Sequence, residues 1–474
     1  MQLYRQRMGI IILFLSDLVI LFLITLLSLV LRNILPAIIH GFPVFSGNPL
    51  QGWWFFPVWS AILTSEGAYS KKVTFWDEVK LLWKVTLFAT LAVLTIVFLS
   101  KLSESYSRSL VILIGLLSLC VFPLLRTTVK RLLIRRGLLK SRVLILGAND
   151  TGKRALSALR KEPNLGYEVI GFVDDDPLKR GRTIDGLKVH GRLQQVERYL
   201  LIGDIQDIVI ALPENDKDNL SHLINRLQHK ARSILYIPDF SGLAVIGMEL
   251  RHFFHDQMFA LEIKNNLARP LNYFAKRLFD YVVGSMLFLA LLIPLLIISI
   301  LIRVTSKGPA IFMQDRVGRN GRPFRCYKFR TMYHDAEARL KVILDTDPVA
   351  RSEWELFRKL KNDPRITRIG SFLRKTSLDE LPQIFNVLLG EMSLVGPRPV
   401  TQEEIDLHYK DAAELCFGVL PGITGFWQVS GRSNTSYENR VSLDSWYVRN
   451  WNLWLDVVIL LKTAYVVVKK EGAI

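Results

Sequence analysis

The chain has 474 residues, of which 50% are hydrophobic, and its formal net charge is +18. This length fits two or three domains. So basic a chain is typical of nucleic-acid-binding proteins or of membrane proteins with positive inner loops. Long apolar runs favour the second class. We therefore predict that the protein associates with a lipid bilayer and does not bind nucleic acid. Cys120, Cys326 and Cys416 match no metal or disulfide spacing, which indicates packing residues in a reducing compartment.

Four apolar runs predict a four-helix transmembrane bundle over residues 1–135. Gly9–Leu31, Leu81–Ser100 and Ser109–Leu125 are long enough to span a bilayer, whereas Trp53–Ala68 is shorter and rich in tryptophan. The first run lacks a small-residue cleavage site, so we interpret it as an anchor.

The loops orient this bundle. Basic residues precede the first run, lie between the second and third, and follow the fourth: Arg5, Arg7, Lys71, Lys72, Lys80, Arg126, Lys130, Arg131, Arg135, Arg136, Lys140 and Arg142. The positive-inside rule therefore predicts that both ends of the bundle are cytoplasmic. Asp17 lies inside the first run, and because a charge at that depth is costly, we expect it to face another helix.

Residues 141–262 predict a Rossmann-like parallel α/β domain, because strand patterns alternate with helical ones. The predicted strands are Arg142–Gly147, Tyr167–Asp176, Ile205–Leu212 and Ser233–Pro238, and a helix is predicted over Leu220–Lys230. The dinucleotide fingerprint is incomplete, since Gly147 and Gly152 are present but Asn149 replaces the middle glycine. Asp174 occupies a plausible ribose-binding position. A bound nucleotide and a purely structural or regulatory module both stay open.

The apolar run Leu278–Ile302 is long enough to span, but Pro294 interrupts it and both flanks are strongly basic. A re-entrant helix that enters the bilayer, bends at Pro294 and returns would keep both flanks in the cytoplasm. A buried core helix is the alternative.

The remainder is basic and aromatic. We predict a helix over Ala336–Lys361, strand and loop over Met392–Pro399 and Val419–Val429, and an amphipathic helix on the membrane surface over Trp446–Lys470.

Within this region, Asp379 and Glu380 form an adjacent carboxylate pair between basic and apolar residues. Ser377 and Glu380 fit a helix capping box, which would make the acids ordinary helix-start residues. If the helix began after Ser377, Pro382 would fall inside it and remove an intrahelical hydrogen bond, which argues against the capping box. A helix that starts nearer Asp379 places Pro382 in the first turn.

The surrounding residues suit chemistry on a phosphate ester at a membrane surface. The candidate phosphate-binding cations are Lys328, Arg330, Arg374, Arg398 and Arg432, and the acids are Asp379, Glu380 and Asp444. Mg²⁺ typically binds one or two carboxylates together with substrate phosphates, so no dedicated metal cage is expected. An aspartate can also attack phosphorus and divide one hard step into two.

From about Lys276 to its end, the chain resembles the bacterial sugar transferases, the polyprenyl-phosphate hexose-1-phosphate transferases. The matching stretches are Lys276-Arg-Leu-Phe-Asp280, Gly308-Pro-Ala-Ile-Phe312, Gln314-Asp-Arg-Val-Gly-Arg-Asn-Gly321, Tyr327-Lys-Phe-Arg-Thr-Met332, Ser377-Leu-Asp-Glu-Leu-Pro-Gln-Ile-Phe-Asn-Val387, Met392-Ser-Leu-Val-Gly-Pro-Arg-Pro399, Pro421-Gly-Ile-Thr-Gly-Phe-Trp-Gln-Val-Ser-Gly-Arg432 and Asp444-Ser-Trp-Tyr-Val448. Four amino-terminal spans and a Rossmann-like middle domain resemble the family's long form.

The resemblance implies a catalytic α/β domain over residues 266–474, with a re-entrant helix over 278–302, on the cytoplasmic face of the bacterial inner membrane. It implies transfer of hexose-1-phosphate from a UDP-hexose to undecaprenyl phosphate with release of UMP, the start of O-antigen, capsule or exopolysaccharide synthesis. By the same resemblance, Asp379 would be the nucleophile that forms a covalent phosphosugar intermediate, and Glu380 would be associated with Mg²⁺. Lys328, Arg374, Arg398 and Asp444 match the family's other important charges. Overall similarity favours galactose over glucose, and a homodimer is the usual expectation.

Two other functions remain as alternatives. A membrane-anchored nucleotide-binding sensor or scaffold would centre on the middle domain and show no turnover. An NAD-dependent nucleotide-sugar dehydratase or epimerase is disfavoured by the incomplete glycine fingerprint and by the lack of a clear Tyr-x-x-x-Lys pair after the sheet.

Overall fold

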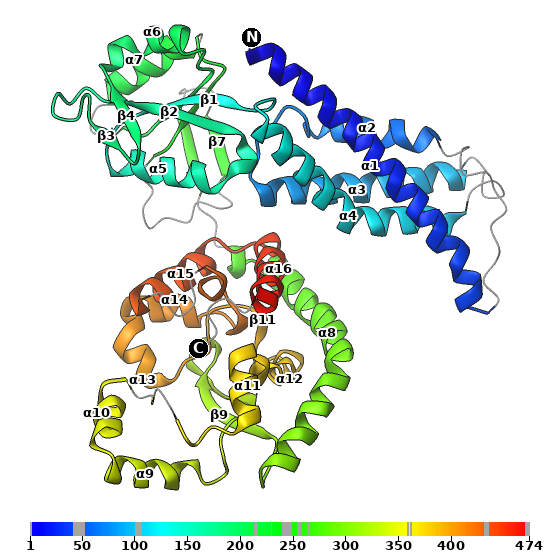
Figure 1. Ribbon diagram of the computed structural model, residues 1–474, viewed down its shortest axis with the longest axis vertical. Coiled ribbons are helices and arrows are strands. Elements are labelled where there is room, and N and C mark those ends of the chain that lie inside the picture. Colours follow the sequence, from blue (N-terminus) through cyan, green and yellow to red (C-terminus); the bar gives the residue numbers. More distant parts are fainter. Residues whose placement is uncertain are drawn as a thin grey trace. The chain divides into compact units, whose positions relative to one another are not determined.

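The computed structural model of the chain describes residues 2–40, 53–99, 107–212, 217–228, 230–238, 249–253, 258–262, 266–357, 360, 363–430 and 436–469. The chain divides into two compact units, residues 1–239 and 240–474 (Figure 1). The first unit contains a helical bundle and an α/β sheet, and the second contains the carboxylate pair.

The bundle consists of α1 (Gln2–Ile38), α2 (Phe55–Ser65), α3 (Phe75–Leu99) and α4 (Arg108–Arg135). Within the described ranges, α1, α3 and α4 are long and apolar enough to cross a bilayer, as is one helix of the second unit. The prediction that all four bundle helices span the bilayer is wrong for α2, because that helix has 11 residues. At 1.5 Å per residue it is about 16 Å long, roughly half the thickness of the hydrocarbon core.

A buried ionic cluster joins the bundle helices. The guanidinium of Arg126 on α4 lies 2.8 Å from Asp17 on α1 and 3.2 Å from Glu78 on α3. The Tyr69 hydroxyl donates a further hydrogen bond of 2.7 Å to Asp17. The expectation that Asp17 faces another helix is therefore confirmed, and the buried charges compensate one another, as buried ions must.

The α/β sheet has the strand order β3-β4-β2-β1-β5-β6. Its strands are β1 (Ser141–Leu146), β2 (Tyr167–Val173), β3 (Thr183–Ile184), β4 (Leu187–His190), β5 (Asp207–Ile210) and β6 (Ser233–Tyr236). All neighbours pair in parallel except β3 and β4, which form an antiparallel pair at one edge. The predicted Rossmann-like parallel sheet is confirmed.

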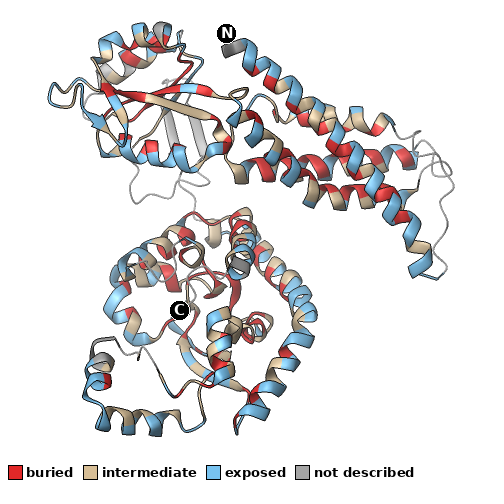
Figure 2. Cartoon of the chain, in the orientation of Figure 1, coloured by how far each residue is buried: buried red, intermediate tan, exposed pale blue. Residues whose placement is uncertain are grey.

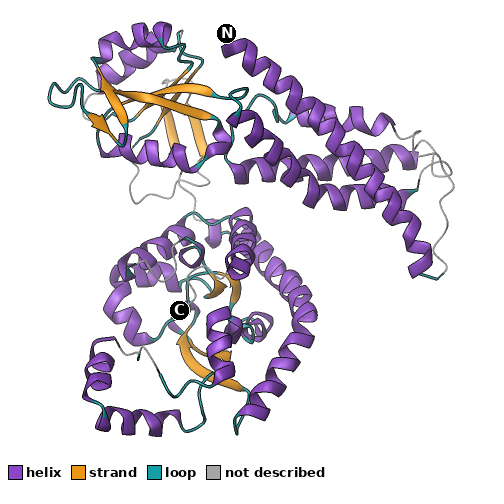
Figure 3. Ribbon diagram, viewed as in Figure 1, coloured by secondary structure: helices purple, strands orange, loops and turns teal. Residues whose placement is uncertain are grey.

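Helices cover both faces of this sheet, as Figure 3 shows. The helix α5 (Asp150–Lys161) packs Leu156 against one face, and α6 (Val196–Ile202) and α7 (Lys217–Leu227) pack Leu200 and Leu223 against the other. The strand interiors are apolar on both faces, as expected for a doubly covered parallel sheet.

The glycine turn after β1 is closed by its own contacts. Gly147 has φ +107°, and a Cβ on Gly152 would lie 2.1 Å from the Gly147 carbonyl oxygen, so α5 approaches the turn too closely for a side chain. The backbone N–H of Ala148 donates to Asp174 Oδ2 at 2.8 Å, and the N–H of Gly152 donates to Asn149 Oδ1 at 2.8 Å. The groups expected to contact a nucleotide thus bond one another, and nucleotide binding stays a prediction.

Bundle and sheet are joined by polar contacts. Lys72 Nζ lies 2.5 Å from Asp207 Oδ2 at the start of β5, and Gln6 on α1 donates a 2.7 Å hydrogen bond to Gln206. Asn164, in the turn before β2, donates to Glu78 of α3 at 2.5 Å. The first unit therefore contains both parts in direct contact.

The first described elements of the second unit are β7 (Glu249–Phe253) and β8 (Met258–Glu262), which form a hairpin, followed by the 36-residue helix α8 (Pro270–Thr305). The helix continues through Pro294 without a break and is curved in Figure 1. Much of its surface is exposed in Figure 2, with Leu289 and Ile293 each 69% accessible. This apolar surface suits lipid, and the re-entrant course stays a prediction.

The rest of the second unit packs on one side of this helix, which curves along its edge in Figure 1. Its elements are β9 (Ile311–Val317), β10 (Pro323–Phe329), α9 (Ala336–Thr346), α10 (Pro348–Phe357), α11 (Arg368–Thr376), α12 (Gln383–Leu389), β11 (Ser393–Val395), α13 (Gln402–Glu404), α14 (Ala413–Phe417), β12 (Gly422–Thr424), α15 (Tyr437–Arg449) and α16 (Leu453–Lys469). β9 pairs antiparallel with β10, and β11 pairs in parallel with β12.

Two predicted helices are each divided in the structure. The segment Ala336–Lys361 contains α9 and α10, separated at Asp347, whose extended backbone is the conformation favoured before a proline. The segment Trp446–Lys470 contains the end of α15 and all of α16, and Asn452 caps the new start by accepting from the Leu455 N–H at 2.9 Å. One face of α16 is buried in the core through Leu455 and Ile459, so it does not lie free on the surface.

A buried polar network connects α8, β11 and α16. Lys276 Nζ donates to Asp456 at 2.7 Å and to the Val395 carbonyl at 2.9 Å. Asp280 accepts from the Leu394 N–H, and Tyr447 donates to both Val395 O and Asp456. This network fixes β11, and with it the start of the Gly396–Pro399 turn.

Candidate active site

A short 3₁₀ turn, Leu378–Glu380, presents the carboxylate pair. Ser377 ends α11 with φ +56° and makes no side-chain capping bond, so the capping-box interpretation is wrong. The helix α12 begins only at Gln383, with Pro382 immediately before it, where the missing N–H removes no intrahelical bond. The two acids therefore lie in a tight turn between two helices.

Glu380 is held by cations. Lys328 Nζ on β10 lies 2.8 Å from Glu380 Oε1, and the guanidinium of Arg398 lies 3.9 Å from the same oxygen. Burial alone would raise the pKa of Glu380, but Lys328 and Arg398 outweigh it and hold this pKa below its ordinary value.

Asp379 has the opposite shift. Burial and the neighbouring Glu380 carboxylate raise the pKa of Asp379, and Lys328 and Arg374 offset this only in part. Adjacent carboxyls with pKa values moved apart are a common sign of divided chemical roles.

The structure brings Arg374 to this pair but directs Arg330 elsewhere. Arg374 donates to the Thr331 hydroxyl at 2.9 Å, and it lies near enough to Asp379 to influence that pKa. Arg330 is buried and donates to the carbonyls of Lys307 and Ser306 at 2.9 and 2.8 Å, just beyond the end of α8. Its position indicates that it joins α8 to β10.

Next to the carboxylates, the Gly396–Pro399 turn places Arg398 beside Trp427, an aromatic residue that the sequence did not single out. The guanidinium of Arg398 lies 5.8 Å from the Trp427 ring centroid, and that of Arg440 lies 4.9 Å from it. Arg440 also lies 5.8 Å from the Tyr437 ring. Two guanidinium groups therefore lie near one indole, and arginines beside an aromatic ring suit the binding of an oligophosphate. Two aromatic residues near one arginine on α15 are the sequence signal that could have identified Arg440.

A further cation, Arg316 on β9, also contributes. Its guanidinium lies 2.9 Å from Glu404, and it lowers the pKa of Glu380 from a greater distance.

Asp444 lies beneath this surface rather than on it. Its side chain is fully buried on α15 and accepts a 3.1 Å hydrogen bond from Tyr409. Burial raises its pKa to about 7, although Tyr409 and the backbone N–H of Arg398 lower it. Asp444 therefore supports the Arg398 turn from below. The predicted Arg432 lies outside the described residues.

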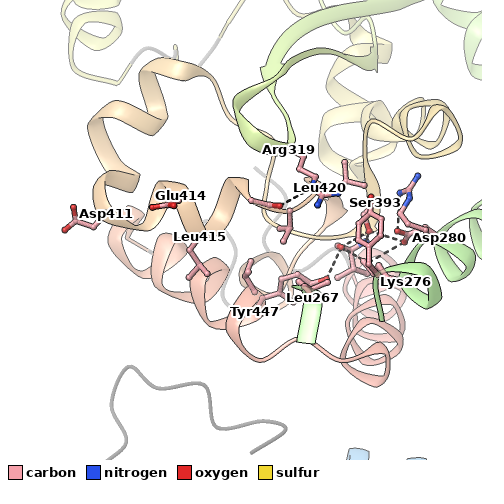
Figure 4. Close-up of a pocket in the computed structure, with 16 residues that line it drawn as sticks. Leu267, Lys276, Asp280, Arg319, Ser393, Asp411, Glu414, Leu415, Leu420 and Tyr447 are labelled. Atoms are coloured by element: carbon pink, nitrogen blue, oxygen red, sulfur yellow. Dashed lines mark hydrogen bonds and ion pairs between the residues drawn. The ribbon is translucent and has the colours of Figure 1, made fainter. Parts of the chain in front are cut away.

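Figure 4 shows a cavity of about 480 Å³ in the second unit, lined by residues of α8, α14 and α15 among others. Two of its lining cations are engaged internally, because Lys276 bonds Asp456 and Arg319 donates to the Gly418 carbonyl at 3.1 Å. Neither Asp379 nor Glu380 lines it. We therefore place the candidate active site at the carboxylate pair.

A metal could be held here only with help from a substrate. In the described part of the chain, no group of three or more His, Cys, Asp or Glu side chains forms a cage. Both cations contact Glu380 through Oε1, which leaves Oε2 without a hydrogen-bonding partner among the described residues. Two carboxylates beside a group of cations fit Mg²⁺, which commonly shares its coordination between protein carboxylates and substrate phosphates.

Comparison with known proteins identifies the family of the chain. Residues 271–470 match the model of the bacterial sugar transferase family, and residues 65–238 match that of a CoA-binding domain. A UDP-galactose-lipid carrier transferase from Erwinia amylovora is 43% identical over 405 residues, covering 85% of this chain and 84% of the relative. The chain belongs to the bacterial sugar transferase family.

Other relatives of this sugar transferase carry two different sugar names. The undecaprenyl-phosphate galactose phosphotransferase of Salmonella typhimurium is 39% identical and covers 85% of this chain and 84% of its own. A UDP-glucose:undecaprenyl-phosphate glucose-1-phosphate transferase from Klebsiella pneumoniae is 33% identical over 70% of this chain and 68% of its own. All three relatives extend well beyond the catalytic region, so the transferase shares their long form.

Proposed function

We propose that the protein transfers hexose-1-phosphate from a UDP-hexose to undecaprenyl phosphate and releases UMP, the first membrane step of polysaccharide biosynthesis. The observation that carries this proposal is the Asp379–Glu380 pair, held among Lys328, Arg374 and Arg398 in a chain whose relatives are named for this reaction.

The first half-reaction uses Asp379. Its carboxylate oxygen attacks the phosphorus that bears the hexose, the bridging P–O bond to the uridine phosphate breaks, and UMP leaves with that bonding pair. Arg398 and Arg440, which both lie near the Trp427 ring, suit the charge of the leaving phosphate. The product is an aspartyl phosphosugar.

The second half-reaction regenerates the enzyme. A phosphate oxygen of undecaprenyl phosphate attacks the same phosphorus, and the acyl-phosphate bond to Asp379 breaks. The exposed apolar surface of α8, within the same unit, gives the lipid acceptor a nearby approach. The lipid diphosphate-sugar is released, and the Asp379 carboxylate is restored.

We propose Mg²⁺ as the cofactor, held by Glu380 and Asp379 together with the donor's phosphates. When bound, it supplies positive charge to the phosphate oxygens. Lys328 keeps Glu380 ionised and therefore able to act as a ligand.

Galactose is our preferred sugar, with glucose as the second candidate, because the 43% and 39% identical relatives have names that refer to galactose. We also propose that the protein resides in the bacterial inner membrane with its catalytic unit on the cytoplasmic face, and that it forms a homodimer.

The test measures UMP release by membranes that contain the full chain. The membranes receive Mg²⁺ and a panel of UDP-sugars, first without undecaprenyl phosphate and then with it. We expect one equivalent of UMP per enzyme without acceptor and continuous release with it, for one hexose. Asp379→Asn should release none, whereas the matched Asp345→Asn, an exposed acid on α9, should behave as wild type. An active Asp379→Asn enzyme would overturn the nucleophile, and no release with any donor would overturn the reaction.

A further inference from the structure

A second basic pocket lies in the first unit, at the ends of two membrane helices. Its volume is about 390 Å³, and it is bounded by the start of α3, the end of α4 and the 3₁₀ turn before β2. Phe75, Trp76, Arg131, Arg135 and Lys161 line it, with Glu162 as its acid. Three cations against one carboxylate give it a net positive charge.

These three cations differ from their basic neighbours. Arg126 and Lys130 are paired with Glu78, and Lys72 is paired with Asp207. Arg131, Arg135 and Lys161 form no ion pair with any residue the structure describes, and the Arg131 guanidinium lies 5.1 Å from the Phe75 ring. Their charges are therefore available to a ligand.

The depth of the pocket matches the phosphate layer of a bilayer. The apolar runs of the sequence end at Leu81, near the start of α3, and at Leu125 in α4, so Phe75 and Arg131 each lie six residues beyond, or about 9 Å along the helix axis. Headgroups begin just outside a hydrocarbon core of about 30 Å. Leu132, beside Arg131, is 50% exposed and offers adjacent apolar surface for an acyl chain. Tryptophan is also enriched at this level in membrane proteins.

We propose that this pocket binds the phosphate of an anionic phospholipid, with Arg131, Arg135 and Lys161 as its ligands. The shared chemistry is a negatively charged phosphate, which arginines can bind with two parallel hydrogen bonds. Basic pockets between helix ends at a membrane surface are suited to such headgroups. Since Lys161 and Glu162 belong to the α/β part, the bound lipid would bridge bundle and sheet. The inference is independent of the reaction proposed above.

The test is native mass spectrometry of the detergent-purified full chain, titrated with phosphatidylglycerol or phosphatidylcholine. We expect preferential binding of phosphatidylglycerol. The combined Arg131→Gln, Arg135→Gln and Lys161→Gln variant should weaken its tightest binding by roughly tenfold or more, without changing phosphatidylcholine binding. The matched variant Arg136→Gln, Lys153→Gln and Arg154→Gln removes the same charge outside the pocket and should bind as wild type.

Two further arms separate structural damage and free phosphate from lipid binding. Arg131→Lys with Arg135→Lys keeps the charge and should retain most of the affinity, which shows that the fold tolerates substitution here. Inorganic phosphate at millimolar concentration should not displace phosphatidylglycerol. Displacement would identify a site for free phosphate and overturn the lipid assignment, as would equal losses in the pocket variant and its matched control.

Discussion

The Lys328 ammonium on β10 lies 2.8 Å from Glu380 Oε1, across 52 residues of sequence. It acts on both carboxyls of the pair, because it lowers the pKa of Glu380 and also lowers that of Asp379. One cation thus favours the ionised form of a metal ligand and of a nucleophile at the same time.

Lys328→Met should therefore change the pH dependence of UMP release as well as its rate. Asp379 reacts as the carboxylate, and removal of the cation raises its pKa further, so the acid limb of kcat/KM should move to higher pH. We expect a loss of about 100-fold at neutral pH. Lys341→Met on α9 is the matched control. A slower enzyme with an unmoved acid limb would assign Lys328 to substrate contact alone.

Arg440→Gln should weaken donor binding more than turnover. Because Arg440 and Arg398 both lie near the Trp427 ring, we expect the KM for the UDP-sugar to rise by about tenfold, with a smaller change in kcat. Arg449→Gln, at the exposed end of the same helix, controls for charge. Steady-state UMP release at varied donor concentration measures both constants, and equal effects of the two substitutions would contradict a role for Arg440 in donor binding.

We expect the contribution of Asp444 to the free energy of unfolding to decrease as pH rises. Its pKa is about 7 when folded, against 3.8 for an unperturbed aspartate, so the folded state binds the proton more tightly. This contribution is fully present below about pH 4 and is lost as pH rises to about 7, with an upper bound on the order of 4 kcal/mol. Asp444→Asn should remove this dependence, which is checked by unfolding midpoints at about pH 5 and about pH 8. The exposed Asp406→Asn should retain the wild-type difference.

Arg330→Gln should lower stability rather than donor affinity. The substitution removes buried hydrogen bonds to the Ser306 and Lys307 carbonyls, at a cost of about 2 kcal/mol, or an unfolding midpoint lower by roughly 4–8 °C. Arg322→Gln, in the exposed turn between β9 and β10, is the control. A raised donor KM with an unchanged midpoint would instead place Arg330 among the substrate contacts.

Several features could be predicted because they depend on local patterning. The strands of the parallel sheet follow from apolar runs separated by helical segments, and the carboxylate pair stands out between a basic and an apolar stretch. The short α2 was mistaken for a span because composition alone does not show where a helix ends. The capping box is absent because the backbone of Ser377 is in the left-handed conformation, which cannot be predicted from the sequence.

Other features depend on contacts between distant residues. Arg330 and Arg374 are both arginines near phosphate-binding motifs, yet one bonds the end of α8 and the other the Thr331 hydroxyl beside Asp379. Arg440 reaches the site only because α15 packs beside Trp427. Likewise, the inward face of α16 is determined by Asp456, whose partner Lys276 lies at the opposite end of the catalytic region.

The bond between Lys276 and Asp456 also has a consequence for biosynthesis. The two residues are 180 positions apart, so a ribosome making 5–20 residues per second needs roughly 10–40 s to supply the second after the first. During that interval Lys276, at the base of a membrane helix, has no Asp456 to neutralise it, and Val395 lacks the support of Tyr447. The turn that carries Arg398 can become fixed only when the last helix has been made. A chain truncated before Leu453 should therefore reach the membrane and still remain inactive.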